Sequence, residues 1–455
     1  MRAGALWLTS LLLLPLTGAP IAAHPSCRRL SLAGRFALSA ACGAVVLSWV
    51  MNLWALAGWR WNVPLLVAAS LVVCLLLRIG MPLADSAPLG LSERFSRGER
   101  AGMVLLGLTV CSSFIAAGTA SASSSDLILF WGPKAQVFAQ ARTIDAGFLS
   151  APYLEYLHAP YPPLVPNIWA FASIVAGRFP WGAATLTFPL LLALLATALP
   201  GFLRLAAPRP TAVASAALCM ATIGYLGDVL DIAGNGDMPL FFFEALATAL
   251  LIGPWALQKS GQLVAGLLLA GAVSAKVEGL PFGLIAGILF LFFRVKARRG
   301  PAARLFLPSL ACLAAWFAFG ASRKLFYGYE GYGKTFEIYW ERASLVAAAI
   351  GKALFDAGYA LPWALALLFL LLVGGSWRRA LIPCGAALGL AAFFFFTYLH
   401  GQPDPTLWIS WSAGRIFTPI AVLLALGAAA RGGCPRFDSD NGRPPASSRP
   451  EASGG

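Results

Sequence analysis

The chain carries little charge for its length, because only 11% of its 455 residues are Asp, Glu, Lys or Arg and only 3 are His. Instead, 59% of the residues are hydrophobic and the mean hydropathy is +0.76. A soluble protein of this size has no core large enough to bury so many apolar side chains. The composition therefore excludes a soluble globular protein and indicates an α-helical membrane protein.

Acidic residues are scarce beside basic ones, with 19 Asp and Glu against 33 Lys and Arg, which gives a net charge of +14. No cluster of Arg among aromatic residues suggests nucleic-acid binding, so we expect the basic groups to lie beside anionic membrane lipids. The 8 cysteines are scattered, and none forms a pair in a predicted outer loop. Neither a disulfide framework nor a zinc site is indicated.

Long apolar runs recur along the whole chain, each about as long as a helix that crosses a bilayer. They predict an all-α polytopic membrane protein with about 12–13 transmembrane helices. The predicted spans are residues 5–23, 36–57, 63–77, 101–120, 183–203, 211–226, 238–257, 262–275, 280–293, 305–319, 359–376, 380–398 and 413–430.

The distribution of Lys and Arg predicts the orientation of these spans. If residue 101 starts on the cytoplasmic side, the cytoplasmic segments hold about 21 of the 33 basic residues but only about 6 of the 19 acidic ones. Every loop from residue 78 onward follows this alternation. We therefore expect a multi-pass protein of the inner (cytoplasmic) membrane.

Four segments follow from these patterns. Residues 1–80 form an N-terminal part with three spans, the first of which is similar to a signal peptide but is expected to stay uncleaved. Residues 81–100 form a basic cytoplasmic linker, and residues 101–430 form the main transmembrane module. The tail, residues 431–455, is polar and rich in Pro, Gly and Ser, so disorder is predicted.

Two predicted outer segments are long, residues 121–182 and 320–358. Within the first, residues 164–176 are apolar but short for a crossing, and we expect them to form a helix lying along the outer interface. The aromatic residues of the second suit the headgroup region of the bilayer.

Polar side chains that can perform chemistry gather in the predicted outer loops. They are Asp126 with Lys134, His158 with Tyr161, Asp228 and Asp231 with Asp237, Lys276 with Glu278, and Arg415 at the start of the last span. A carboxylate can take a proton from a hydroxyl group as a general base, or can bind a divalent cation. Asp126, Asp237 and His158 are the candidate ligands if a metal is used. Lys276 and Arg415 can neutralise a phosphate group.

Each of these residues also has a purely structural interpretation. Asp126 suits a solvated helix end, and Asp237 suits the first turn of a helix, where the dipole favours an acid. Lys276 and Glu278 suit an exposed ion pair, and Arg415 can anchor its helix at the headgroups. Glu244, two turns into a predicted span, suits pairing inside the bundle.

In their order along the chain, these motifs resemble the polytopic GT-C glycosyltransferases, in the bacterial branch related to protein mannosyltransferases and aminoarabinose transferases. The resemblance covers residues 101–430. It rests on Asp126 followed by Trp131 and Lys134-Ala135, on His158 to Leu164, on Gly236-Asp237-Met238-Pro239, on Lys276-Val277-Glu278-Gly279, and on Ser412 to Arg415.

The resemblance implies a GT-C-like helical bundle that transfers a sugar, with inversion, from a polyprenyl-phosphate-linked donor to an acceptor on the extracytoplasmic face. Asp126 would be the general base and Asp237 the second catalytic acid. Lys134, His158, Tyr161, Lys276, Glu278 and Arg415 would bind substrate.

The sequence departs from both branches of this family. Leu127 follows Asp126 where protein mannosyltransferases have a second acid, and Tyr161 precedes Pro162-Pro163 where the aminoarabinose enzymes have Lys. The sugar, the acceptor and any metal requirement therefore stay open. The alternative function is a transporter or flippase for a lipid-linked saccharide, and a non-catalytic membrane scaffold is a third interpretation.

Overall fold

The computed structural model describes residues 2–82, 96–119, 124, 126–151, 159–226, 236–295, 299–325, 338–400 and 404–433. Throughout these ranges the regular structure is helical, and no strand occurs in them. The first helices are α1 (Arg2–Ser10), α2 (Leu13–Ala22), η1 (Pro25–Arg29), α3 (Leu32–Leu56), α4 (Val63–Ile79), α5 (Arg97–Thr119), η2 (Leu127–Trp131), α6 (Gly132–Ala141), α7 (Ala146–Leu149), α8 (Leu164–Ala176), α9 (Trp181–Ala184), α10 (Thr187–Leu203) and α11 (Arg209–Leu226). The remaining ones are α13 (Asp237–Ile252), η4 (Pro254–Leu257), α14 (Lys259–Ala275), α15 (Gly279–Arg294), α16 (Arg299–Ser322), η5 (Trp340–Arg342), α17 (Ala343–Leu354), α18 (Ala357–Leu372), α19 (Trp377–Leu399) and α20 (Pro405–Arg431).

Among the described residues, six helical segments are long and apolar enough to cross a membrane, or up to eight if each of two bent helix pairs counts as one span. These helices indicate a multi-pass membrane protein. The predicted number of 12 or 13 exceeds this count, because several predicted spans form shorter helices. For example, α14 has 17 residues, which is about 26 Å at 1.5 Å per residue, against about 30 Å of hydrocarbon.

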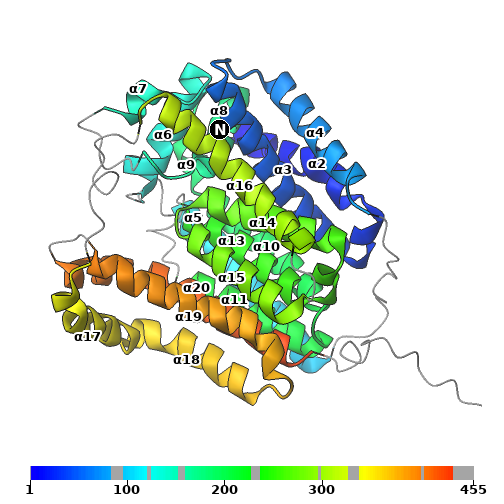
Figure 1. The fold of residues 1–455 in the computed structure, drawn as a ribbon, viewed down its shortest axis with the longest axis vertical. Helices are drawn as coiled ribbons and strands as arrows, with labels where there is room; N and C mark the ends of the chain where they lie inside the picture. Colours follow the sequence, from blue (N-terminus) through cyan, green and yellow to red (C-terminus); the bar gives the residue numbers. More distant parts are fainter. Residues whose placement is uncertain are drawn as a thin grey trace, which may run out of the picture.

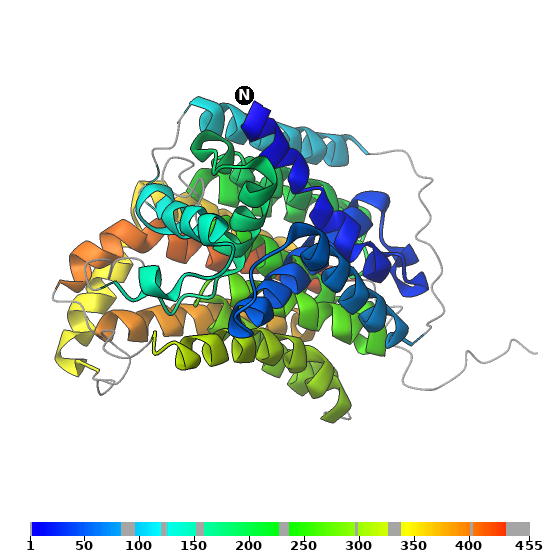
Figure 2. The same cartoon turned by 90° about the horizontal axis from the view of Figure 1, so that it is seen from above.

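The apolar helix α13 lies at the centre of the molecule. All 16 of its residues are buried, including the first one, Asp237. A helix that is hydrophobic on every side is stable only when other helices surround it. In Figures 1 and 2, helices α2 to α4 lie on one side of the central helices and α17 to α20 lie on the opposite side.

The short helix α8 covers the apolar run predicted to lie along the membrane interface. It has 13 residues, too few to cross a bilayer, as predicted. However, the stretch Leu164–Ser173 is buried within the protein. Its apolar side chains therefore pack mainly against neighbouring helices, and its position along the membrane interface stays a prediction.

Helix α20 bends by 42° between its segments Pro405–Arg415 and Phe417–Arg431. Pro419 lies inside the helix and has no backbone N–H to donate to the carbonyl of Arg415, four residues earlier. Such a missing hydrogen bond is a common cause of a kink. The bend therefore lies beside Arg415, one of the predicted site residues.

Candidate functional site

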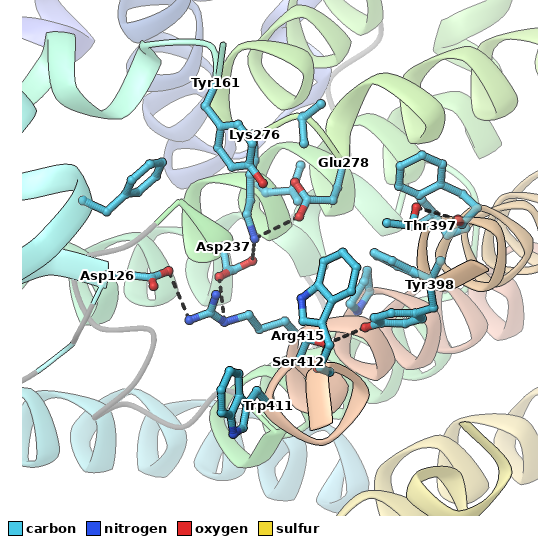
Figure 3. Close-up of a pocket in the computed structure, with 18 of the residues that line it drawn as sticks. Asp126, Tyr161, Asp237, Lys276, Glu278, Thr397, Tyr398, Trp411, Ser412 and Arg415 are labelled. Atoms are coloured by element: carbon cyan, nitrogen blue, oxygen red, sulfur yellow. Dashed lines mark hydrogen bonds and ion pairs between the residues drawn. The ribbon is translucent and has the colours of Figure 1, made fainter. Parts of the chain in front are cut away.

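A cavity of about 860 Å³ lies where the ends of α13, α14, α15 and α19 meet η2 and α20. Figure 3 shows the polar side chains that point into it. The lining residues are Asp126, Leu129, Phe130, Trp131, Tyr161, Asp237, Leu240, Glu244, Lys276, Val277, Glu278, Leu390, Phe393, Phe394, Thr397, Tyr398, Asp404, Leu407, Trp408, Trp411, Ser412, Arg415 and Pro419. Residues from widely separated parts of the chain thus share one cavity.

Five of the charged side chains form a continuous series in which acids and bases alternate (Figure 3). Lys276 Nζ lies 3.1 Å from Glu278 Oε1 and 2.7 Å from Asp237 Oδ1. Arg415 Nε lies 3.6 Å from the other oxygen of Asp237, and its Nη2 lies 3.1 Å from Asp126 Oδ2. Each cation therefore bridges two carboxylates, and the carboxylate of Asp237 bridges both cations.

Asp237 is placed by the start of α13. Asp237 is the first residue of the helix, where the helix dipole favours an acid. Pro239 is tolerated two residues later, because backbone N–H groups in the first turn have no partner within the helix. The preceding residue, Gly236, lets the ring of Trp131 pack closely, since a Cβ at Gly236 would lie 2.8 Å from that ring. The Gly-Asp-Met-Pro motif thus fixes both the acid and one aromatic wall of the cavity.

Lys276 and Glu278 are placed by the tight turn between α14 and α15. Lys276 leaves the helix in an extended conformation with φ −158° and ψ 156°. Gly279 allows the turn to close, because a Cβ there would come within 2.0 Å of the carbonyl oxygen of Ala272. The Lys-Val-Glu-Gly motif therefore has a clear structural reason for ending in glycine.

Asp126 and Arg415 both lie beside irregular helical backbone. Asp126 immediately precedes the π-helical turn η2, and Arg415 lies at the bend of α20. Their side chains are 25% and 30% exposed, whereas that of Asp237 is 3% exposed. Asp126 and Arg415 are thus the members of the series most accessible to a ligand.

Lys276 is a buried cation, with 6% of its surface exposed. Burial lowers the pKa of Lys276, but the carboxylates of Asp237 and Glu278 raise it by more, so its pKa lies above the usual range. Lys276 is therefore charged at neutral pH. The alternative prediction of an exposed Lys276–Glu278 ion pair is half right, because the pair exists but its cation is buried.

Of the three candidate ligands for a possible divalent cation, Asp126, Asp237 and His158, only the two acids are among the described residues. Arg415 occupies the space between the carboxylates of Asp126 and Asp237, the two acids proposed as ligands. Nowhere in the described ranges do three His, Cys, Asp or Glu side chains form a group suited to a metal ion. A guanidinium and an ammonium group pair with these acids, and a metal requirement stays a prediction.

The cavity contains most, but not all, of the predicted site residues. Asp126, Tyr161, Asp237, Lys276, Glu278 and Arg415 line it. Lys134 does not, because its Nζ is buried 4.1 Å from the centroid of the Phe130 ring and 5.5 Å from that of Trp131. Burial lowers the pKa of Lys134 well below its usual range. His158, Asp228 and Asp231 lie outside the described residues.

Several lining residues were not predicted as site residues. Trp408, Trp411 and Ser412 lie on the first part of α20, and Tyr398 on α19 donates to or accepts from Ser412 Oγ at 2.5 Å. The spacing of Trp408, Trp411 and Arg415 places them on one helical face. That spacing is the signal that could have identified the two tryptophans from the sequence.

No family model matches this chain, and neither a curated protein nor a solved structure matches it. The resemblance to GT-C enzymes therefore rests on the sequence motifs alone.

Proposed function

We propose that this protein is a membrane glycosyltransferase of GT-C-like architecture. It would transfer a sugar from a polyprenyl-phosphate-linked donor to an acceptor on the extracytoplasmic face of the cytoplasmic membrane. The observation that carries the proposal is the ion-paired series formed by Asp126, Arg415, Asp237 and Lys276 in one cavity at the ends of apolar helices.

The edge of this cavity suits a substrate with a lipid tail. Leu129, Leu407 and Trp411 line the cavity and are also 54%, 46% and 74% exposed. In a membrane protein, exposed apolar side chains face lipid. A polyprenyl chain could therefore remain in the bilayer while its phosphate reaches the cations.

In the proposed reaction, Asp126 takes the proton from an acceptor hydroxyl group as that oxygen attacks the anomeric carbon of the sugar. The bond between the anomeric carbon and the phosphate oxygen breaks, and polyprenyl phosphate leaves with the bonding electron pair. Arg415 and Lys276 stabilise the negative charge that develops on the phosphate. Attack from the opposite side inverts the anomeric configuration.

The proposal is tested by replacing Asp126 with Asn in protein reconstituted into liposomes with polyprenyl-phosphate-linked pentoses and hexoses. Loss of a general base lowers the rate about 10²–10⁴-fold, so we expect almost no release of polyprenyl phosphate by the variant. Asp145→Asn is the matched control, because Asp145 caps α7 in the same loop and does not line the cavity. Near-normal turnover by Asp126→Asn, with normal membrane insertion, would remove Asp126 from this role.

Transport of a lipid-linked saccharide is the second candidate function. It is favoured by one observation, the presence of the buried acid Glu244 inside the apolar helix α13 and along the same cavity. A transported polar group needs such residues within the membrane. Measuring translocation and sugar transfer in the same proteoliposomes separates the two: movement of intact donor without release of polyprenyl phosphate would establish transport.

A further inference from the structure

Two acids that line the cavity lie outside the ion-paired series, Asp404 and Glu244. Asp404 accepts hydrogen bonds from the backbone at the start of α20, whereas Glu244 lies inside α13. Glu244 lies on the same face of α13 as Asp237 and Leu240, at spacings of seven and four residues, and all three line the cavity. Seven residues of α-helix correspond to about 10 Å. Glu244 therefore lies about two helical turns further into the protein than Asp237.

Within the described part of the chain, Glu244 has neither a hydrogen bond nor an ion pair, although only 2% of its surface is exposed. Glu278, Asp237 and Lys276 line the same cavity as Glu244. However, the ammonium group of Lys276 is already bound to the other two carboxylates. The sequence-based expectation that Glu244 pairs inside the bundle is therefore not met.

The Glu244 side chain borders the cavity, so a ligand in the cavity can supply the hydrogen-bond partner that the described residues do not. The two cations, Lys276 and Arg415, lie toward the start of α13, and an anionic group would bind there. The part of the substrate that reaches Glu244 would then be the uncharged part attached to that anion. For a sugar phosphate, this part is the sugar ring with its hydroxyl groups.

We propose that Glu244 binds a hydroxyl group of the transferred sugar at the inner end of the cavity and so helps to select the donor. This proposal rests on the proposed function. Glu244 would be a specificity-determining residue, because it would contact the sugar but neither the attacking oxygen nor the leaving phosphate.

Two substitutions test the proposal in proteoliposomes with polyprenyl-phosphate-linked pentoses and hexoses. Glu244→Gln keeps the shape and can hydrogen-bond a hydroxyl group, so we expect kcat/KM within about threefold of the wild type. Glu244→Met has a similar volume but makes no such bond, so kcat/KM should fall about 10- to 100-fold. The control is Thr248→Val, one turn further along α13, because Thr248 is buried but does not line the cavity.

Donors that lack one hydroxyl group at a time distinguish binding from a structural role. The wild type should discriminate about 10- to 100-fold against one of these deoxy donors, and Glu244→Met should show no such discrimination. If Glu244→Met slows all donors equally, the residue is structural and the proposal is overturned. A large loss in Glu244→Gln would also overturn it, because a charged partner such as an amine would then be bound.

Thermal stability gives a readout that needs no substrate. Because Glu244 has no partner in the fold, Glu244→Met should leave Tm unchanged or raise it. A marked fall in Tm would indicate a structural role and contradict the proposal. If the wild type transfers no sugar, the proposed function itself fails; if it transfers sugar and Glu244→Met transfers it equally well, only the role of Glu244 fails.

Discussion

Replacing Lys276 with Met tests whether the buried ion pairs hold the helix ends together. Lys276 lies within 2.7 Å of Asp237 and 3.1 Å of Glu278, and its side chain is only 8% exposed. Removing one partner from a buried pair costs about 3–5 kcal/mol, because the remaining charge is left without compensation. Here Arg415 still lies 3.6 Å from Asp237, and the Glu278 side chain is 20% exposed. We therefore expect Lys276→Met to lower the free energy of unfolding by an amount near the lower limit of that range.

The loss is measured as the fall in Tm during heating in detergent, followed by fluorescence of the 15 tryptophans. The shift in Tm for each kcal/mol of lost stability becomes smaller as chains become longer. A loss of about 3 kcal/mol therefore corresponds to a fall in Tm of roughly 3–6 °C in this protein. The control is Lys259→Met, at the opposite end of α14, where the lysine is exposed and the change should stay within about 0.5 kcal/mol.

A double variant makes the test more specific. Adding Asp237→Asn to Lys276→Met removes the uncompensated acid. The double variant should therefore lose about 1–2 kcal/mol less stability than the sum of the losses in the two single variants. Equal Tm values for Lys276→Met and Lys259→Met would refute the idea that this network stabilises the fold.

Three further predictions follow from the same geometry. Arg415→Lys should lower sugar transfer about tenfold or more, because one ammonium group cannot reach both Asp126 and Asp237 as the guanidinium does; transfer at the wild-type rate would contradict this bridging role. Gly236→Ala should lower Tm, with a cost of about 1–3 kcal/mol, because its Cβ would lie 2.8 Å from the Trp131 ring; combination with a smaller residue at 131 should restore part of the loss. Treatment with a chelator should leave sugar transfer unchanged, because Arg415 occupies the space between the candidate ligands; a loss that Mg²⁺ or Mn²⁺ reverses would overturn that interpretation.

The sequence was most informative where a motif determines its own local backbone. Asp237 begins a helix because Gly236 and Pro239 surround it, and Lys276 ends one because Gly279 allows the turn. Such residues lie at helix ends, and helix ends from one side of a bundle meet in space. Because the motifs lie at helix ends, the gathering of these residues in one cavity could be expected from the sequence.

Other features depend on side-chain direction, which apolar patterns do not specify. Lys134 follows Asp126 by only eight residues, yet its side chain is buried against Phe130 and does not line the cavity. Glu244 lies in a run of apolar residues that are buried on every side, so periodicity cannot show which face borders a cavity. The contributions of both residues became clear only from the packing.

The position of the ion-paired series explains how an apolar bundle can contain so many charges. Helices α13 and α14 are buried along nearly their whole length, and the charged residues lie at the ends of these helices. There, an acid at the start of α13 interacts favourably with the helix dipole, and the extended backbone at Lys276 lets its side chain reach two acids. Glu244 has neither advantage, since it lies within the helix and has no partner in the described residues. If selection for stability alone had shaped this helix, position 244 would carry an apolar residue like its neighbours, so the acid is best explained by a ligand that reaches it.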